Sequence, residues 1–260
     1  MKATTTVSIL KYNRDRFIEL DDAVVTEVSL SIVVNDTKIA EILCTPLDIR
    51  ELVTGFLFSE KRIDGAEEIG AIELDTEKWT VSVETETKTC TWVVPQHVRL
   101  ITPGDLSSGN PESVTHTPGD STGKSKIFIS AADMHAIGKQ VHSRSKIFKK
   151  TGGAHSAAVC NGKDMKFFRE DIGRHNALDK IIGRCLLDHI NTHDKTIVTS
   201  GRISSAVVEK VVHAGFPVLV SRSAPTDRAV QLSEKYGITM IGFARGCDFN
   251  VYSNAWRVRE

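Results

Sequence analysis

Four arginines in the second half of the chain each follow a short apolar segment and stand beside glycine or serine. They are Arg174, Arg202, Arg222 and Arg245, in the stretches REDIGRH, TSGRISS, SRSAP and ARGC. A guanidinium group offers a planar fork of donors that matches phosphate oxygens, and small neighbours let backbone N–H groups approach a ligand. These residue types predict a site for a polyanion, whereas unrelated surface arginines are the alternative.

The stretch 169–180, REDIGRHNALDK, crowds polar residues into the start of a helix that also has an apolar face. The residues Gly-Arg-His-Asn fall in its first turn, which we expect to face the polyanion. His175 and Asp179 are four residues apart and share a face of the helix, so the carboxylate can orient the imidazole. A solvated ion pair is the alternative interpretation of this pair.

A second group of small residues precedes a strand at 151–158, TGGAHSAA. Gly152 and Gly153 permit a tight backbone turn, and His155 follows them directly. A Gly-Gly pair is a weak signal by itself, but its place before a strand suits a backbone turn near a ligand.

These residues need a scaffold that brings them together, and the second half of the chain predicts one. A hairpin over 154–170 turns at Asn161-Gly162, and then helices near 175–190, 204–214 and 226–236 alternate with apolar strands at 196–200, 217–221 and 238–243. Such alternation predicts a mostly parallel sheet covered by helices. Because ligands bind at the carboxyl edge of open α/β sheets, we expect the four arginines to gather at one edge.

The first half reads as a sheet with one helix against it. Residues 24–44 form a predicted hairpin around the turn pair Asn35-Asp36. Thr45 is the predicted N-cap of a helix with Pro46 at its first position, and Leu47, Leu52 and Phe56 form its apolar face. Alternation then returns after Gly65, with Trp79, Val81 and Val83 on one face.

A segment rich in Ser, Thr, Gly and Pro separates the halves over 103–123 and predicts a loop or linker. A helix is predicted from Ser130, and its apolar face is formed by Met134, Ile137, Val141 and Phe148.

Composition excludes several classes of protein. The 33 basic and 33 acidic residues of the 260-residue chain cancel, which argues against a nucleic-acid or polybasic membrane surface. The first residues lack the apolar run of a signal peptide and no segment has a membrane-spanning length, so we expect a soluble cytoplasmic protein with no membrane insertion. Five scattered cysteines without a CxxC pair predict buried thiols rather than disulfides or structural zinc.

Taken in order, TGGAHSAA (151–158), EDIGRHNALDK (170–180), SGRISSAVVEK (200–210), SRSAPT (221–226) and IGFARG (241–246) resemble motifs of the formate dehydrogenase accessory sulfurtransferase (FdhD) family. CTPLDIRELVTGFLFSE (44–60) resembles that family's N-terminal helix motif. The resemblance implies an α/β fold, in which residues 127–260 form a larger cytidine-deaminase-like α/β/α sandwich. Residues 1–102 would form a smaller N-terminal α+β domain, and 103–126 a flexible loop or linker.

Proteins of that family assist the maturation of molybdenum- or tungsten-dependent formate dehydrogenase. They pass sulfur from a cysteine desulfurase to the bis(molybdopterin guanine dinucleotide) form of the molybdenum cofactor. The resemblance therefore implies these two proteins as partners, a homodimer, and that cofactor as the bound client, with a guanine nucleotide as its mimic. The cofactor-binding positions it implies are Thr151, Gly152, Gly153, His155, Arg174, His175, Asn176, Asp179, Ser200, Gly201, Arg202, Ser221, Arg222 and Arg245.

One departure from the family concerns sulfur chemistry. The family carries sulfur on a CxxC in the loop between its halves, and the matching segment here, LSSGNPESVTHTPGDSTGKS, has no cysteine. Because a persulfide relay needs an accessible thiolate, Cys247 beside Arg245 is the candidate catalytic residue, and ordinary packing is the alternative. Two functions stay open, a sulfurtransferase and a cofactor-binding chaperone without sulfur transfer, so whether the protein is an enzyme stays open too. Deaminase activity and a metal site are not expected, because the zinc motifs H-x-E and P-C-x-x-C do not occur.

Overall fold

The computed structural model describes residues 1–86, 100–101 and 125–260. The loop predicted over 103–123 lies outside these residues. The second half of the chain is built on a six-stranded sheet with the order β10-β9-β11-β12-β13-β14. Its strands are β9 (His155–Asn161), β10 (Asp164–Asp171), β11 (Thr196–Thr199), β12 (Val218–Ser221), β13 (Thr239–Arg245) and β14 (Asp248–Ser253).

Only the central strands of this sheet are parallel. β11, β12 and β13 pair in parallel, whereas β9, β10 and β14 join antiparallel. The expectation of a mostly parallel sheet is thus correct for its centre and wrong for its edges, because the short connections within β9–β10 and β13–β14 permit only antiparallel pairing. Two antiparallel steps separate β10 from β11, so β10 runs in the same direction as the parallel strands. The carboxyl ends of β10, β11, β12 and β13 therefore meet at one edge.

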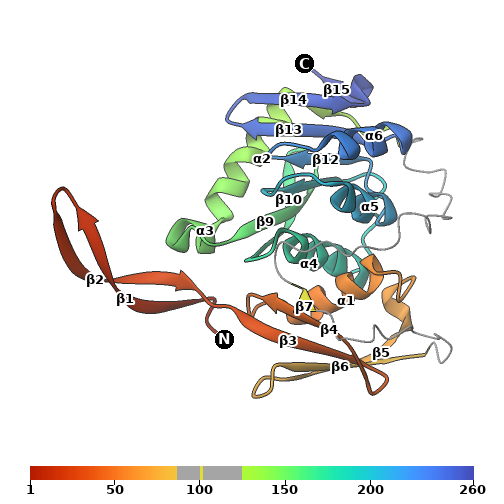
Figure 1. The fold of residues 1–260 in the computed structure, drawn as a ribbon. Coiled ribbons are helices and arrows are strands. Elements are labelled where there is room, and N and C mark those ends of the chain that lie inside the picture. The colour runs from red at the N-terminus through yellow and green to blue at the C-terminus, as the bar shows by residue number, and fades with distance from the viewer. Residues whose placement is uncertain (87–99, 102–124) are drawn as a thin grey trace.

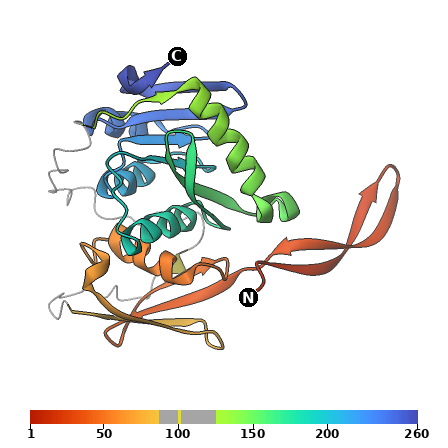
Figure 2. The same ribbon diagram turned by 180° about the vertical axis from the view of Figure 1, so that it is seen from behind.

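Helices cover both faces of this sheet, which gives three layers (Figures 1 and 2). On one face lie α4 (Arg174–Leu187), α5 (Ser205–His213) and α6 (Asp227–Lys235), and on the other lies α2 (Ala131–Arg144). The predicted α/β class is confirmed. Short elements complete this part: α3 (Lys146–Thr151), η2 (Ala255–Arg257), and the pair β8 (Ile129–Ser130) and β15 (Val258–Arg259).

Two details of this half differ from the sequence prediction. Phe148 was expected on the apolar face of the helix from Ser130, but that helix ends at Arg144 and Phe148 lies on α3 with 48% of its surface exposed. The hairpin turns at Gly162-Lys163, one residue later than predicted, because Asn161 still pairs with Asp164. Met134, Ile137 and Val141 are buried as expected.

The first half is a five-stranded sheet with the order β5-β6-β3-β4-β7. Its elements are β3 (Val28–Val34), β4 (Thr37–Cys44), α1 (Ile49–Ser59), η1 (Ala66–Glu68), β5 (Ile69–Asp75), β6 (Thr80–Thr85) and β7 (Leu100–Ile101). The hairpin prediction is confirmed, since Asn35 and Asp36 form its turn with φ of 44° and 64°. Val81 and Val83 are buried on one face of β6, and Trp79 lies just before that strand and is partly buried.

The predicted start of the first helix is wrong. α1 begins at Ile49 after Asp48, whose φ of 53° turns the chain into the helix. The backbone N–H of Thr45 instead donates to the carboxylate of Asp171 (3.1 Å), and its carbonyl accepts from Lys180 (3.4 Å). These long-range hydrogen bonds hold Thr45 outside the helix, so Leu47 is not part of the helical face, whereas Leu52 and Phe56 are buried in it.

The two halves share one core, and α1 packs against α4 at its centre. Gly55 on α1 and Gly183 on α4 make this close approach possible. A β-carbon at Gly55 would overlap the carbonyl oxygen of Asp179, and one at Gly183 would overlap the carbonyl oxygen of Glu51. Backbone therefore lies directly against backbone where the helices cross.

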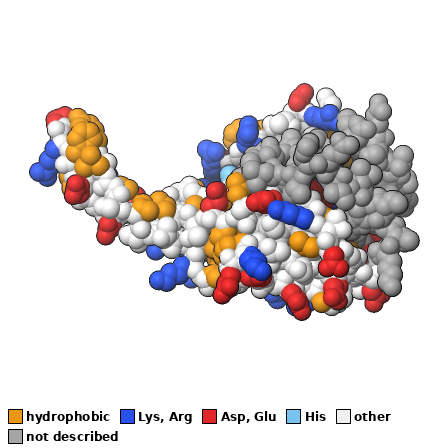
Figure 3. All heavy atoms as spheres, turned by 60° about the horizontal axis from the view of Figure 1, so that its bottom comes forward, with side chains coloured by type: hydrophobic (Ala, Val, Ile, Leu, Met, Phe, Trp, Pro, Cys, Tyr) orange, Lys and Arg blue, Asp and Glu red, His pale blue; other side chains and the backbone are white. Residues whose placement is uncertain are grey.

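A two-stranded arm extends from this body, which the sequence prediction missed. β1 (Thr4–Asn13) and β2 (Arg16–Val25) pair with each other along their full length and point away from the rest of the molecule (Figures 1 and 3).

The helix contact yields a first prediction. Gly55→Ala should lower the free energy of unfolding by about 1–3 kcal/mol or more, because the added methyl group forces α1 and α4 apart. Gly138→Ala on α2 is the matched control, since a β-carbon there meets nothing within 4 Å, and it should stabilise by up to ~1 kcal/mol. Urea-induced unfolding followed by circular dichroism measures both. Equal midpoints for Gly55→Ala and the parent would contradict the close contact.

Candidate functional site

The loops that follow β10, β11 and β12, together with the start of β9, form the carboxyl edge of the six-stranded sheet. At its centre Ser200 accepts a hydrogen bond from the backbone N–H of Ser156 (2.9 Å), and its hydroxyl lies 3.2 Å from Nδ1 of His155. The loop after β11 then passes under the first turn of α4. A β-carbon on Gly201 would lie 2.8 Å from the β-carbon of Arg174, so only glycine allows this approach.

Hydrogen bonds join the neighbouring loops along the same edge. The hydroxyl of Ser221 donates to the carbonyl of Gly201 (2.6 Å), and the backbone N–H of Arg222 donates to the carbonyl of Thr199 (3.2 Å). Arg245 reaches back from β13, and its Nε donates to the carbonyl of Arg222 (3.0 Å). The four arginines therefore stand at the ends of strands that share one edge, as the alternation of elements predicted.

A single buried carboxylate fixes the start of α4 at this edge. Asp171, the last residue of β10, accepts hydrogen bonds at Oδ1 from the N–H of Gly173 (2.9 Å) and from the side chain of Asn176 (2.8 Å). Its Oδ2 accepts from the N–H of Thr45, and it pairs with Lys180 at 2.7 Å. Asn176 also donates to the carbonyl of Leu43 (2.8 Å), so this predicted cofactor ligand supports the fold with its side-chain amide.

Positive groups accumulate at the first turn of α4. Burial lowers the pKa of Arg174, and the charge of Arg202 lowers it further. Burial also lowers the pKa of His155, and Arg174 acts in the same direction. The pKa of His175 falls to about 3, first because the ring is buried and then because Lys210 and Arg174 repel a proton on it. An anion bound here would relieve each of these unfavourable interactions.

Two buried polar atoms at this turn have no hydrogen-bond partner among the residues that the structure describes. They are Nε2 of His175, whose residue is 8% exposed, and Nε of Arg174. Unpartnered buried donors are rare in proteins and call for an explanation such as a ligand. The N-terminus of α4 adds backbone N–H groups at the same place, and Gly173 provides no capping side chain. The site can therefore hold an anion rich in acceptor oxygens.

The proposed orientation of His175 by Asp179 is wrong. The two carboxylate oxygens of Asp179 accept hydrogen bonds from Lys210 (2.7 and 2.6 Å), and one also accepts from Ser59 (2.7 Å). Burial raises the pKa of this carboxyl, and the contact with Lys210 opposes the rise. Asp179 is buried and links α1, α4 and α5. The alternative interpretation, a solvated ion pair of His175 and Asp179, is therefore wrong as well.

Thr151, Gly152 and Gly153 lead into the edge from α3. The hydroxyl of Thr151 donates to the carbonyl of Ile147 (2.8 Å) and accepts from the N–H of Gly153 (3.1 Å). Gly152 ends the helix with a φ of 69°, a conformation that favours glycine. These residues form the tight backbone turn that the sequence predicted. One residue separates the turn from His155.

Sequence reasoning missed the lysines of this region. Lys180 and Lys210 lie on buried faces of their helices, and each neutralises an acid that would otherwise be buried alone. The one feature of the sequence that could have indicated these buried lysines is a lysine within the apolar face of a helix, as in ALDKII and AVVEKVV.

Cys247 lies in the tight turn between β13 and β14 and is exposed. Its Sγ is 3.5 Å from Nδ1 of His135 on α2. Cys44, Cys160 and Cys185 are buried, and burial raises the pKa of each thiol to about 12. Among the cysteines that the structure describes, Cys247 is the one that a solvent-borne reagent can reach.

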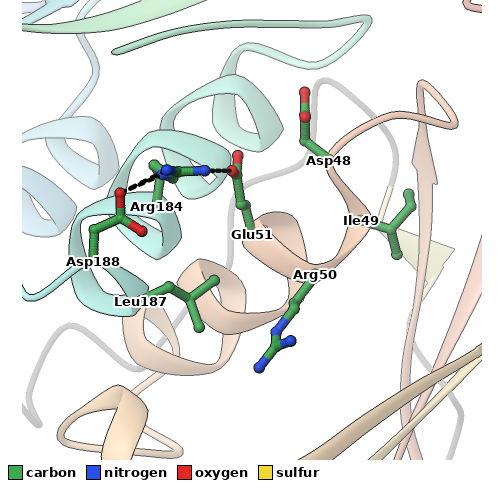
Figure 4. A pocket seen from close by; sticks show the side chains of 7 residues that line it. All are labelled: Asp48, Ile49, Arg50, Glu51, Arg184, Leu187 and Asp188. Carbon is green, nitrogen blue, oxygen red and sulfur yellow. Dashed lines mark hydrogen bonds and ion pairs between the residues drawn. The ribbon is translucent and has the colours of Figure 1, made fainter. Parts of the chain in front are cut away.

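A pocket lies elsewhere, between α1 and the C-terminal end of α4 (Figure 4). It has a volume of about 460 Å³ and is lined by Asp48, Ile49, Arg50, Glu51, Arg184, Leu187 and Asp188. Figure 4 shows Arg184 between Glu51 (3.2 Å) and Asp188 (2.6 Å). Because Glu51, Asp188 and Arg184 already neutralise one another, this pocket offers a charged ligand less than the carboxyl edge, where Arg174 and Arg202 form no ion pair with any described residue.

In the residues that the structure describes, no helix combines the length and apolarity needed to cross a membrane. No set of three or more His, Cys, Asp or Glu side chains is arranged to bind a metal ion there.

A model of the FdhD/NarQ family matches residues 25–259. The sulfur carrier protein FdhD of Bacillus subtilis is 36% identical over 276 residues, which cover 100% of this chain and 99% of that protein. The sulfur carrier protein FdhD of Geobacillus kaustophilus is 39% identical, with 96% of this chain and 95% of that protein covered.

A solved structure has the same fold. The crystal structure of a putative formate dehydrogenase accessory protein from Desulfotalea psychrophila superimposes with a TM-score of 0.79. The match covers 99% of this chain and 100% of that one at 23% sequence identity.

The burial of His175 yields a second prediction. Its pKa is about 3 in the folded chain and 6.5 in the unfolded chain, so between these values only the unfolded chain binds the proton. The free energy of unfolding should therefore fall as the pH drops below about 6.5, by at most ~1.4 kcal/mol per pH unit from this residue. His175→Gln removes the titrating group and should reduce the loss between about pH 7 and pH 5 by roughly 1–2 kcal/mol.

Urea-induced unfolding at both pH values measures this loss. His142→Gln, which replaces an exposed histidine on α2, is the matched control and should keep the pH dependence of the parent. If His175→Gln loses as much stability as the parent, the buried neutral imidazole is not the cause.

Proposed function

Because the chain belongs to the FdhD/NarQ family, we propose that it is an accessory protein for the maturation of formate dehydrogenase. This role is supported by its relatives, which are sulfur carrier proteins FdhD, and by the structural neighbour described as a formate dehydrogenase accessory protein. In this role, the carboxyl edge of the six-stranded sheet binds the guanine dinucleotide form of the molybdenum cofactor as cargo. The observation that carries the binding proposal is the buried Nε2 of His175, which has no hydrogen-bond partner in the described part of the chain, beside the mutually repelling Arg174 and Arg202.

The residues of the edge suit the chemistry of such a cargo. A dinucleotide carries phosphate oxygens, which accept charge-assisted hydrogen bonds from guanidinium groups and from helix N–H groups. Arg174 and Arg202 supply the charge, Gly201 lets the two loops approach, and the first turn of α4 supplies the backbone donors. Ser200, His155 and Ser221 keep the loops in place, whereas Asn176 and Asp179 support the site from below.

We propose Cys247 as the sulfur-carrying thiol, with a cysteine desulfurase in the cytoplasm as the donor. In this step the thiolate of Cys247 attacks the outer sulfur of the donor's persulfide. A new S–S bond forms on Cys247, the donor's S–S bond breaks, and the donor cysteine leaves as a thiolate. Exposure of Cys247 and the high pKa of the three buried thiols support this assignment.

The alternative is a chaperone that binds and shields the cofactor without carrying sulfur. The absence of cysteine from 103–126, where the family has its CxxC, favours this second function. Both functions use the same anion site and differ only in the fate of sulfur.

Binding of guanosine diphosphate tests the site. Arg174→Gln and Arg202→Gln should each weaken binding about tenfold or more, because each removes a charge-assisted hydrogen bond to phosphate. Lys163→Gln is the matched control for charge, since it lies in the β9–β10 turn at the opposite edge of the sheet, and it should bind as the parent does. Calorimetry at several salt concentrations measures the affinity, which should fall as salt rises. Unchanged affinity in both arginine variants would remove the site.

A second pair of variants tests geometry without changing charge. Gly201→Ala should also weaken binding, because its methyl group pushes against the side chain of Arg174, whereas Gly138→Ala should not.

Persulfide labelling separates the two functions. After incubation with a cysteine desulfurase and cysteine, mass spectrometry should find one added sulfur on the peptide that contains Cys247, and none there in Cys247→Ser. Cys90→Ser is the matched control and should still be labelled at Cys247. A parent protein that acquires no persulfide while it binds guanosine diphosphate would be the chaperone.

A further inference from the structure

Cys247 and His135 make a contact between two elements that are far apart in the sequence. Cys247 lies in the turn between β13 and β14, and its Sγ is 3.5 Å from Nδ1 of His135 on α2. The same Nδ1 lies 3.2 Å from the carbonyl oxygen of Gly246. The contact thus joins the exposed thiol to the helix that covers the other face of the six-stranded sheet from α4.

The carbonyl of Gly246 decides where the imidazole of His135 carries a hydrogen. A carbonyl oxygen can only accept a hydrogen bond, so Nδ1 must be protonated in order to bond with it. The N–H of Nδ1 is then a donor that faces two acceptors, the oxygen of Gly246 and the sulfur of Cys247. A thiolate accepts such a bond with the help of its charge, whereas the sulfur of a neutral thiol is a weak acceptor. His135 therefore presents to the sulfur the donor that a thiolate needs.

The start of α2 is fixed, and His135 with it. Ser130 and Asp133 form a capping box, in which the N–H of Ser130 donates to the carboxylate of Asp133 (3.0 Å) and the N–H of Asp133 donates to the hydroxyl of Ser130 (3.1 Å). Met134 and Ile137 next to His135 are buried against the sheet. The imidazole is thereby held by a capped and packed helix.

The turn that carries the thiol is equally constrained. Arg245 pairs with Asp248, which leaves Gly246 and Cys247 as a two-residue connection, and Gly246 has a φ of 62°, which favours glycine. Arg245 also ties this turn to the carboxyl edge, because its Nε donates to the carbonyl of Arg222 (3.0 Å). Cys247 therefore stands beside the edge at which the cargo is proposed to bind.

We propose that His135 is a positioning residue for Cys247, whose thiolate it holds as the nucleophile of sulfur transfer. This inference rests on the proposed role of Cys247 as the sulfur carrier. In the transfer step, the thiol first loses its proton to solvent. The thiolate then attacks the outer sulfur of the donor's persulfide, and the donor cysteine leaves as a thiolate. One S–S bond forms as another breaks, so no oxidant or reductant is consumed. Since only the thiolate attacks, the N–H of His135 accelerates the step by increasing the thiolate fraction.

Three variants of the full-length protein separate hydrogen-bond donation from packing. His135→Phe keeps a ring but removes the donor. His135→Asn restores a donor, because its amide nitrogen is as many bonds from the backbone as Nδ1 is. His142→Phe, which makes the same substitution at an exposed position two turns later on α2, is the matched control. All three variants retain the charged residues within four positions of either partner, which are Asp133, Lys139, Arg245 and Asp248.

Alkylation of Cys247 by iodoacetamide, followed by mass spectrometry of its peptide, reports on the thiolate. At about pH 7, His135→Phe should have a thiolate fraction about tenfold lower than the parent. Because a less stabilised thiolate is more nucleophilic, alkylation should slow by only about threefold. At about pH 10 the thiol is ionised in both proteins, so the variant should react at the same rate or slightly faster. His135→Asn and His142→Phe should react as the parent does at both pH values.

Equal alkylation rates for the parent and His135→Phe at about pH 7 would overturn the proposal. A His135→Asn variant as slow as His135→Phe overturns it too, since a restored donor should restore the rate. So does a His135→Phe variant that is slower by the same factor at both pH values, because access to the sulfur and not its ionisation has then changed.

The rate of persulfide acquisition from a cysteine desulfurase, measured on the same four proteins, should follow the alkylation rates at about pH 7. A parent that is alkylated faster than His135→Phe but acquires no persulfide would overturn the sulfur-transfer role of the pair, whereas the hydrogen bond to the thiolate would stand. Failure of the contact and failure of the sulfur-carrier function are thus distinguished.

Discussion

The structure depends on the four hydrogen-bond donors that surround the carboxylate of Asp171. This group is fully buried at the end of β10, and burial of an unpaired charge would cost several kcal/mol. Lys180 supplies the opposite charge, Gly173 and Asn176 supply donors from the start of α4, and Thr45 supplies one from the first half of the chain. One carboxylate thereby holds a strand end, a helix start and the N-terminal part in a single arrangement.

That arrangement places positive charge where it is least favourable without a ligand. The fold holds Arg174, Arg202 and His155 close together, and among residues 1–86, 100–101 and 125–260 the buried Nε2 of His175 has no hydrogen-bond partner. In the proposed site, donors held in place by the fold do not need to move to meet an anion, so little binding energy would be lost to ordering. The support for these donors comes from Asp171 and from the Asp179–Lys210 pair beneath them, both of which lie inside the protein and do not compete for the ligand.

The glycine contact between α1 and α4 joins the two sheets in one core. At the crossing, Gly55 and Gly183 allow backbone to meet backbone, and Glu51 on α1 pairs with Arg169 and Arg184 beside it. α1, the helix that follows the first hairpin of the N-terminal sheet, thus packs into the same core as α4. The arm of β1 and β2 contributes no residue to this core.

The sequence alone determined the alternation of helices and strands in the second half, because local hydrophobic patterns and connection lengths set the direction of each strand. With that alternation it also determined that one edge of the sheet carries Arg174, Arg202, Arg222 and Arg245. It also determined the Asn35-Asp36 turn, where two adjacent residues accept positive φ. Only the tertiary structure decided where α1 begins, because the hydrogen bonds of Thr45 come from Asp171 and Lys180, which are more than a hundred residues away. It likewise decided that Asp179 pairs with Lys210 on another helix and not with His175 on its own, since a buried carboxylate takes the partner that neutralises its charge.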